Sequence, residues 1–325
     1  MCLTWRAFVA ILKPRGATAM LPLLVLAVCA TTALAQARDI RITVATYNVR
    51  SFLDDLDDPF TFDEERPPKA REELEQIAAA IRKMNADVIA FQEVENEQTL
   101  RAFVHELLGG MKYRHVVVSP TNSMHGLNLG VISRLPIDSF TSHRHRTLNM
   151  PDPTQRRRFA RDVLRVRIDT PAQRHLDLYV VHFKSKYDSE EDPESKQWRL
   201  AEARATRRIV DEALAADPSA WVLLLGDLND APDSGTLRSL LKRGGPEAPK
   251  PLLDLHEKLP ARRRVTYLRG RHRGTVDYML ASPALAERLV RGSARVLDDP
   301  SVLDGSDHAP LFASFNSGLS VSDSD

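Results

Sequence analysis

The chain has little cysteine and no excess of charge of either sign. Its two cysteines, Cys2 and Cys29, lie near the N-terminus, so a chain cleaved after residue 35 has no thiol and forms no disulfide. The 45 basic residues balance 44 acidic ones, and bulk charge therefore gives no argument for nucleic-acid binding. Tandem repeats of about 20–50 residues are also lacking, as is a long linker. The 43% hydrophobic content is enough for the core of one large domain.

The first 35 residues have the composition of a secretory signal peptide. Residues 1–16 carry three basic and no acidic side chains, residues 17–30 are apolar, and Ala33-Leu34-Ala35 forms a small-x-small cleavage pattern. The alternative is an uncleaved anchor helix, for which the apolar segment is short and is interrupted by Pro22. We therefore expect residues 1–35 to be removed, leaving a periplasmic or secreted monomer with no stable membrane insertion.

Hydrophobic periodicity predicts strands and helices from residue 40 onward. Ile40, Ile42 and Val44 alternate with polar residues as in a strand, whereas residues 69–84 carry apolar side chains three or four apart, as in an amphipathic helix. Further strands are predicted over 87–92, 114–118, 128–133, 161–168, 176–182, 221–226, 275–281 and 310–315, and further helices over 97–108, 194–216 and 283–290. So many strands with few helices between them fit an α/β fold in which two β-sheets pack face to face with helices outside. We expect one domain over 36–315 and a flexible polar tail over 316–325.

Polar side chains that suit a hard divalent cation lie at the ends of several predicted strands. Asn48 follows the first strand, Glu93 follows the second, and Asp307 precedes the last. Magnesium prefers oxygen ligands of this kind, and manganese or calcium are alternatives. Each residue taken singly also suits an ordinary loop, turn or helix cap. Together they predict a metal site.

The segment GDLND ends a continuous apolar run and places two polar residues in alternation. Asp227 and Asn229 point to the same side of the chain, where Asp227 would activate water and Asn229 would hold a phosphate oxygen or a water molecule. The alternative is an Asx turn that closes the strand. His182 and His308 also lie beside strand-like segments, and a buried Asp277 would orient the His308 imidazole and raise its proton affinity. These five residues are the predicted catalytic group.

In their order along the chain, these motifs resemble the endonuclease/exonuclease/phosphatase superfamily, which includes pancreatic deoxyribonuclease, abasic-site endonucleases, bacterial sphingomyelinases and inositol polyphosphate 5-phosphatases. The resemblance spans about residues 40–315 and implies a four-layer α-β-β-α sandwich with the site at one end of two mixed sheets. By position it implies metal contacts for Asn48, Glu93 and Asp307, and it places the predicted catalytic group around phosphate and water. The stretch 60–96 further resembles an exported bacterial nuclease-like branch.

Several basic residues are candidates for binding substrate phosphate. Arg161, Lys184 and Arg273 lie close in sequence to the predicted site, and arginine runs occur at 156–158 and 262–264, although solvated loops explain such runs equally well. The leading hypothesis is an exported, Mg²⁺-dependent phosphodiesterase, an endonuclease that acts on nucleic acid. The alternatives are a phosphatase or phospholipase C-like enzyme acting on a phosphorylated sugar, inositol or lipid headgroup, and a binding module without catalysis.

Overall fold

The protein was analysed as a computed structural model that describes residues 38–58, 60–62, 66–187, 189–242 and 250–320. The predicted signal peptide lies outside the described residues. Within them, no helix combines the length and apolar character needed to cross a membrane.

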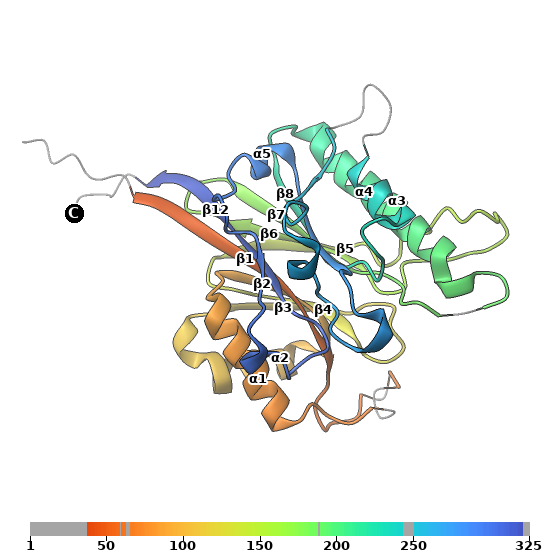
Figure 1. Cartoon of the computed structure of the whole chain (residues 1–325), viewed down its shortest axis with the longest axis horizontal. Coiled ribbons are helices and arrows are strands. Elements are labelled where there is room, and N and C mark those ends of the chain that lie inside the picture. Colours follow the sequence, from red (N-terminus) through yellow and green to blue (C-terminus); the bar gives the residue numbers. More distant parts are fainter. Residues whose placement is uncertain (1–37, 59, 63–65, 188, 243–249, 321–325) are drawn as a thin grey trace, which may run out of the picture. The chain divides into compact units, whose positions relative to one another are not determined.

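Two six-stranded sheets form the centre of the domain (Figure 1). The first has the order β11-β12-β1-β2-β4-β3 and the second the order β5-β6-β7-β8-β10-β9. The strands of the first sheet are β1 (Arg38–Phe52), β2 (Val88–Val94), β3 (His115–Ser119), β4 (Asn128–Ser133), β11 (Arg295–Val296) and β12 (Leu311–Ser320). Those of the second are β5 (Ile137–Ser142), β6 (Val163–Asp169), β7 (His175–His182), β8 (Trp221–Asp227), β9 (Leu253–Asp254) and β10 (Asp277–Ala281).

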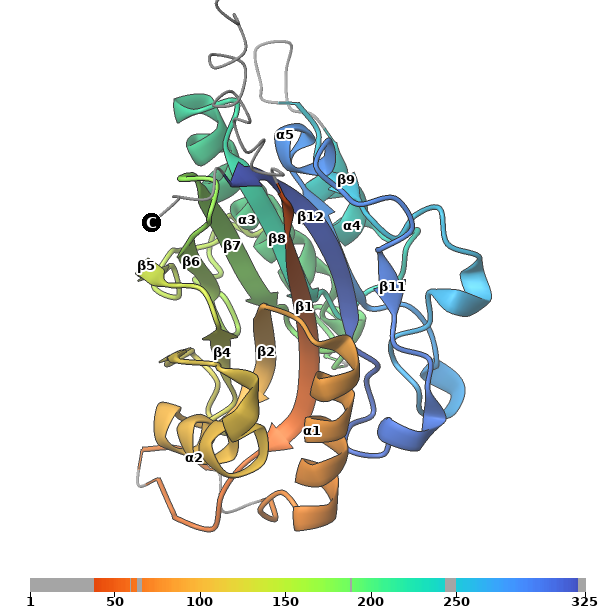
Figure 2. The same cartoon turned by 90° about the vertical axis from the view of Figure 1, so that its left-hand side faces the viewer.

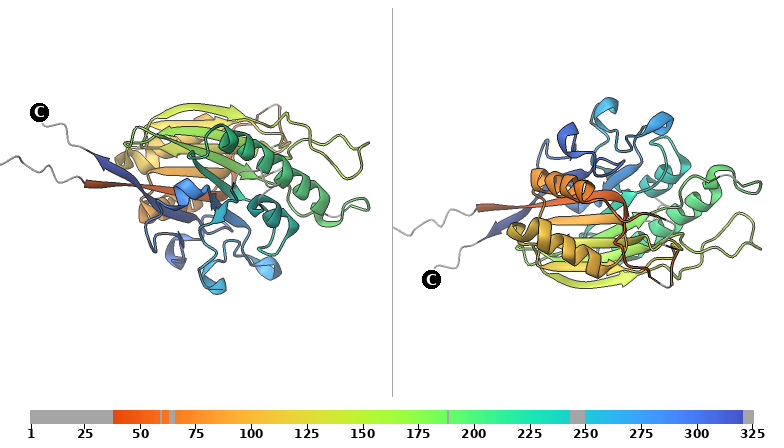
Figure 3. Two further views of the ribbon diagram at one scale, coloured as in Figure 1. Left: turned by 90° about the horizontal axis from the view of Figure 1, so that it is seen from above. Right: turned by 90° about the horizontal axis from the view of Figure 1, so that it is seen from below.

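Helices cover the outer face of each sheet. Helices α1 (Arg71–Met84) and α2 (Glu97–Leu108) lie on the first sheet, whereas α3 (Lys196–Ala216) and α4 (Gly235–Leu241) lie on the second, and α5 (Pro283–Ala286) is a single turn (Figures 1 and 3). Three apolar layers hold this arrangement together: one between the sheets, one under α1 and α2, and one under α3 and α4. The predicted four-layer α/β sandwich is confirmed.

Local sequence explains where the helices begin and end. Asn96 caps α2 by accepting a hydrogen bond from the backbone N–H of Thr99, and Ser234 caps α4 by accepting one from that of Leu237. Helix α1 ends at Asn85, which has the left-handed backbone conformation typical of a helix C-terminus.

The strand directions bring polar residues to one edge of the sandwich. Strands β1 and β2 are parallel in the first sheet, and β7 and β8 are parallel in the second. All four strands end near this edge. Asn48 therefore lies beside Gln92 in one sheet, and His182 lies beside Asp227 in the other. Strand β10 then places Asp277 next to Asp227 from its other side.

The predicted polar tail over 316–325 is wrong for residues 316–320. These residues continue β12, which pairs with the beginning of β1 (Figure 2). The Ser317 hydroxyl donates a hydrogen bond to the Ile40 carbonyl, and Ser317 is buried. The small polar side chains therefore conceal a strand whose stability comes from backbone pairing. Residues 321–325 of the predicted tail lie outside the described residues.

Three strands and one helix were not predicted, and one predicted helix is shorter. Strand β5 forms the exposed edge of its sheet, so it lacks the apolar pattern of a buried strand. Strands β9 and β11 have two residues each, and α4 has seven, which is too short for a periodic signal. The predicted helix 283–290 contains only the four residues of α5.

Candidate active site

A cavity of about 650 Å³ lies where β1, β2, β7 and β8 end. Six of the eight residues predicted as metal ligands or as the catalytic group line it: Glu93, His182, Asp227, Asn229, Asp307 and His308. Two more, Asn48 and Asp277, are buried behind this surface and contact its members. The structure thus brings together all eight residues predicted as metal ligands or as the catalytic group.

Asp227 lies at the centre of the site, at the end of β8. Its Oδ1 accepts a hydrogen bond of 2.7 Å from the Asn229 backbone N–H, and its Oδ2 accepts one of 3.1 Å from the Asn48 amide. Burial and the nearby Asp277 carboxylate raise the pKa of Asp227 to about 7, although His308 and the hydrogen bonds oppose this effect. A carboxyl group with this pKa can accept a proton near neutral pH.

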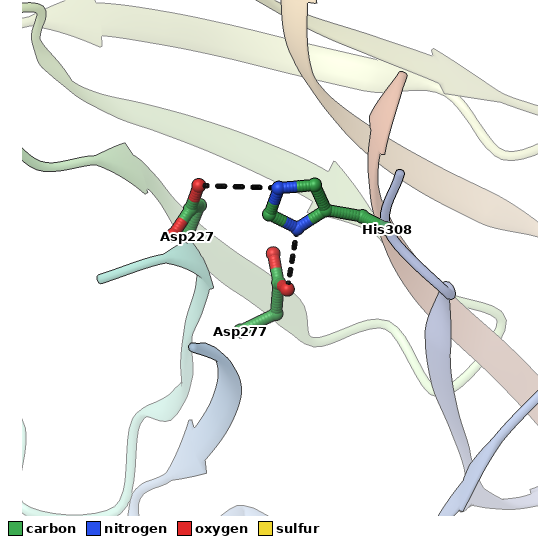
Figure 4. A group of neighbouring side chains, drawn as sticks. All are labelled: Asp227, Asp277 and His308. Carbon is green, nitrogen blue, oxygen red and sulfur yellow. Dashed lines mark hydrogen bonds and ion pairs between the residues drawn. The ribbon is translucent and has the colours of Figure 1, made fainter. Parts of the chain in front are cut away.

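His308 forms a buried pair with Asp277 (Figure 4). Its Nδ1 lies 2.8 Å from Asp277 Oδ2, and its Nε2 lies 3.9 Å from Asp227 Oδ2. Burial favours the neutral imidazole, but the Asp277 carboxylate, with help from Asp227 and Asp307, outweighs this effect and raises the pKa of His308 to about 10. The imidazole is therefore held in its protonated form, with Nε2 directed toward Asp227.

His182 is held in the opposite protonation state. It is buried, and its Nε2 lies 3.6 Å from Asp227 Oδ2 and 3.9 Å from Glu93 Oε1. Burial, together with the positive charges of Arg161, His308 and Lys184, keeps the pKa of His182 well below its ordinary value. The two histidines therefore differ in charge within one cavity.

Asn48, Glu93 and Asp307 carry oxygen atoms of the kind that a hard divalent cation prefers, with the Asn48 oxygen also accepting a hydrogen bond from the Arg50 backbone N–H at 3.0 Å. Glu93 and Asp307 line the cavity, and the Asn48 amide contacts Glu93 Oε1 at 3.4 Å. A second possible set is Asp227, Asp277 and His308, whose ligand atoms all lie within 4.8 Å of one another. In that set His308 is already paired with Asp277 through Nδ1, whereas Glu93 and Asp307 offer oxygen atoms, the ligand type that a hard cation prefers, in the cavity wall.

Backbone strain is concentrated around this cavity. The ends of β1 and β2 turn sharply, so that the Ser51 backbone N–H donates to Glu93 Oε2 at 2.8 Å and the Arg50 N–H donates to Asn48 Oδ1 at 3.0 Å. Side chains other than glycine rarely adopt positive φ angles, and such angles cluster at functional sites. Four residues here have them: Arg50 (48°), Ser51 (47°), Glu93 (67°) and Asn229 (51°).

The predicted phosphate-binding residues have different positions. Arg161 lines the cavity and donates a hydrogen bond from Nη1 to the Phe183 carbonyl. Lys184 lines a neighbouring hollow instead. Arg273 is exposed and is not among the residues that line the cavity, whereas His272, one residue earlier, is; a role for Arg273 in binding substrate phosphate stays a prediction. The short helical turn at Gly270–His272 sets which of these neighbours faces inward.

Sequence reasoning missed several residues of the cavity wall, among them Tyr267, Arg50 and Lys69. The Tyr267 ring packs edge-on against His308 with 5.2 Å between ring centroids. Arg50 Nε lies 3.9 Å from Asp307 Oδ2, and Lys69 Nζ donates to the Arg50 carbonyl. Arg50 follows Asn48 by two residues, so the motif around Asn48 could have identified it as a site residue. Tyr267 and Lys69 reach the site only through folding, and no local pattern marks them.

Comparisons with known proteins place the chain in a family. A sequence model of the Endonuclease/Exonuclease/phosphatase family matches residues 43–299. A search among curated proteins found no match. Similar solved structures include the human Nocturnin catalytic domain with bound sulfate anion, with 17% identity, a TM-score of 0.60, and coverage of 86% of this chain and 95% of that chain.

Two further structures share the fold. Truncated TDP2 from Caenorhabditis elegans has 15% identity and a TM-score of 0.55, covering 86% of this chain and 99% of that one. An AP endonuclease from Archaeoglobus fulgidus has 18% identity and a TM-score of 0.54, covering 85% and 99%. At such low identity these likenesses establish the fold alone. Because the family model matches most of its length, the chain belongs to the endonuclease/exonuclease/phosphatase family.

Proposed function

We propose that this protein is an exported, divalent-metal-dependent phosphodiesterase, an endonuclease that hydrolyses nucleic acid by in-line attack of water. The observation that carries the proposal is the buried cluster of Asp227, Asp277 and His308, whose side chains contact one another at the cavity wall. The same wall holds the carboxylates of Glu93 and Asp307, which could bind a cation. Structural similarity to an AP endonuclease supports a nucleic-acid substrate. The signal-peptide pattern of residues 1–35 supports export.

Asp227 is the proposed base that takes a proton from the attacking water. The Asn229 backbone N–H and the Asn48 amide fix its carboxylate at two oxygen atoms. Its raised pKa, about 7, makes proton transfer from water more favourable than it is for an ordinary aspartate. Asp227 therefore combines a fixed orientation with suitable basicity.

His308 is the proposed electrostatic partner of the phosphate. Asp277 orients the imidazole through Nδ1 and keeps it protonated, so that Nε2 can donate to a phosphate oxygen as negative charge develops. Asn229 donates from its amide to the Phe183 carbonyl, and this contact holds it beside the cavity for a phosphate oxygen or a water molecule. The neutral His182 would donate one ring N–H to the phosphate or assist the leaving group.

Asn48, Glu93 and Asp307 are the residues that would hold the cation, with Mg²⁺ as the proposed ion and Mn²⁺ or Ca²⁺ as alternatives. Asp307 is paired with Arg50 at 3.9 Å, and the Ser51 N–H and Asn48 amide fix the Glu93 carboxylate. A divalent ion in this family polarises the phosphoryl oxygens and offsets the charge that develops during hydrolysis.

The test compares wild type with Asp227→Asn on plasmid DNA, single-stranded RNA, sphingomyelin and inositol phosphates in the presence of Mg²⁺. We expect nucleic-acid cleavage by wild type and a loss of at least about 100-fold in the variant, because a positioned base contributes about this much. Asp233→Asn, an exposed change six residues away, is the control and should retain full activity.

Chelation provides the second arm. Excess EDTA should abolish activity, and Mg²⁺, Mn²⁺ and Ca²⁺ added back separately should identify the ion. Release of a headgroup or of phosphate without nucleic-acid cleavage would replace the substrate assignment. Full activity of Asp227→Asn, or activity that persists in EDTA, would contradict the mechanism.

A further inference from the structure

A second hollow of about 790 Å³ adjoins the candidate active site and differs from it in its balance of charged side chains. The two share Arg66, Arg161 and Ser185 in their walls. The active-site cavity is lined by four carboxylates and five arginine or lysine residues. The adjoining hollow, which we call the basic groove, has no carboxylate among its lining residues in the described part of the chain and has six cationic ones: Arg66, Arg156, Arg157, Arg158, Arg161 and Lys184.

Within the described residues, no acidic side chain pairs with the arginine run in this groove. Arg156, Arg157 and Arg158 are exposed, and none of them forms an ion pair with a residue in the described part of the chain. Arginines without acidic partners beside a phosphoester site are available to bind phosphate groups. This distinguishes the run from arginines such as Arg165, whose guanidinium is bound to Asp177.

Aromatic rings lie among these cations. The Arg157 guanidinium lies 4.7 Å from the Trp198 ring centroid, and Lys184 Nζ lies 5.5 Å from that of Tyr187. Tyr187 is 68% exposed, an unusual degree of exposure for a ring in the wall of a hollow. Cationic side chains along a groove together with an exposed ring are the combination that binds single-stranded nucleic acid, since unpaired bases can stack on the ring.

Buried charged residues of α3 hold the two walls of the groove in place. Glu202 is fully buried, and its carboxylate accepts hydrogen bonds of 2.7 Å from the backbone N–H groups of both Ala160 and Lys184. Arg199, also fully buried, donates to the Lys184 carbonyl and forms an ion pair with Asp230. The segment 156–161 and the segment 184–187 are therefore fixed to one helix, which reduces the conformational entropy lost on binding.

We infer that the basic groove binds the unpaired strand that flanks the scissile phosphodiester, with Arg156 and Arg157 contacting its phosphates and Tyr187 stacking on one base. This inference rests on the proposed function, because it assigns the substrate of the same site. It also restricts that substrate: a base within a duplex has both faces covered by its neighbours and cannot stack on Tyr187 without leaving the helix. The preferred substrate is therefore single-stranded or locally unpaired nucleic acid.

Binding can be tested without turnover. Fluorescence anisotropy in EDTA measures the Kd of a labelled 12-nucleotide single strand, as DNA and as RNA, and of the matching duplex. We expect Tyr187→Ala to raise the single-strand Kd by about 5- to 150-fold, as loss of one stacked base does. Its control is Phe140→Ala, an exposed ring on strand β5 that does not line the groove.

Salt dependence tests the arginines. Arg157→Ala should weaken binding and reduce the slope of log Kd against log salt concentration by about 0.7, the value for one phosphate contact on a single strand. Arg291→Ala is the control, because this exposed arginine follows α5 and lines neither the groove nor the active-site cavity. Circular dichroism of each variant establishes that it is folded.

The outcomes separate the two proposals. A Tyr187→Ala Kd within twofold of wild type, or an equal loss on duplex, would overturn the groove assignment whether or not the protein cleaves nucleic acid. Conversely, absence of any hydrolysis, including that of bis(p-nitrophenyl) phosphate, would contradict the proposed function while leaving the binding result intact. If both hold, the loss of turnover in Tyr187→Ala should be at least fivefold greater on the oligonucleotide than on bis(p-nitrophenyl) phosphate.

Discussion

At the scale of single residues, the candidate site is defined by groups whose surroundings move their protonation equilibria in different directions. The same burial raises the pKa of Asp227 and lowers that of His182, because it disfavours the charged form of each. His308 is equally enclosed, yet its contact with Asp277 reverses the effect and raises its pKa. Such pairs of groups with opposite shifts are the usual basis of acid–base chemistry in enzymes.

The Asp277–His308 pair has a consequence for stability that can be measured in the metal-free protein. The pKa of His308 is about 10 in the folded state and 6.5 in its ordinary environment. Below pH 6.5 both folded and unfolded chains hold the proton, and the stabilisation is complete. Between pH 6.5 and about pH 10 only the folded chain holds the His308 proton. The free energy of unfolding therefore falls as pH rises, by at most about 1.4 kcal/mol per pH unit. Near pH 10 the contribution is lost.

Urea unfolding in EDTA at several pH values between 6 and 10.5 measures this slope. We expect His308→Gln to be less stable than wild type at pH 6.5 and to lose stability less steeply as pH rises. His105→Gln, an exposed change on α2, should keep the wild-type slope. Parallel curves for wild type and His308→Gln would mean that Asp277 does not hold a proton on this imidazole.

The sequence predicted which residues the fold brings together, because each follows or precedes an apolar run. Asp227 and Asn229 alternate after Trp221–Leu225, and this pattern alone places both on one side of the chain. The position of Asp277 beside Asp227 depends instead on the register between β8 and β10, which no local pattern specifies. The turn at Gly270–His272 shows the same limit, since local sequence does not specify that His272 rather than Arg273 lines the cavity.

At the scale of elements, β8 delivers Asp227 through an unusual last step. Gly226 has φ of 132°, and a Cβ atom there would lie 2.1 Å from the Val181 carbonyl oxygen of β7. Any side chain at this position would push β7 and β8 apart immediately before the two residues that face each other across them, His182 and Asp227. Glycine is therefore required both for pairing and for the position of the base.

We expect Gly226→Ala to lower the free energy of unfolding by at least about 2 kcal/mol, since it combines backbone strain with a steric clash. Thermal and urea unfolding measure the change, and phosphodiester hydrolysis should fall together with stability. Gly292→Ala is a suitable control because its φ is also positive, 75°, while a Cβ atom there meets nothing within 4 Å. An effect of Gly226→Ala no larger than that of Gly292→Ala would show that the strands tolerate the added methyl group.

Element prediction succeeded where packing imposes a pattern and failed where it does not. Strand β4 was predicted at its observed bounds because its side chains are mostly buried on both faces of the sheet. Within the sheet it pairs with β2 on one side and β3 on the other. Strand β5 was missed because most of its side chains are exposed, and its pairing with β6 leaves no apolar alternation to detect. The sequence therefore predicted the layers of the fold better than the edges of its sheets.

At the scale of the whole domain, β12 links the C-terminal part of the chain to both the core and the site. Asp307 and His308 lie just before this strand, and β12 then runs antiparallel to β1 for its full length (Figure 2). Its last part was expected to be a flexible tail. Residues 316–320 therefore contribute to stability through backbone hydrogen bonds.

Truncation distinguishes a strand from a tail. A chain ending at Phe315 loses the hydrogen bond from the Ser317 hydroxyl to the Ile40 carbonyl and that from the Asn316 N–H to the Arg288 carbonyl, together with the ladder beyond them. At about 0.5–1.5 kcal/mol for each hydrogen bond, the free energy of unfolding should fall by about 2–4 kcal/mol. A chain ending at Ser320 is the matched control and should equal the full-length protein. Urea unfolding of the three chains measures the difference, and equal stability of all three would restore the flexible tail. If only the chain ending at Phe315 loses stability, backbone pairing stabilises residues 316–320, a segment whose composition alone suggests disorder.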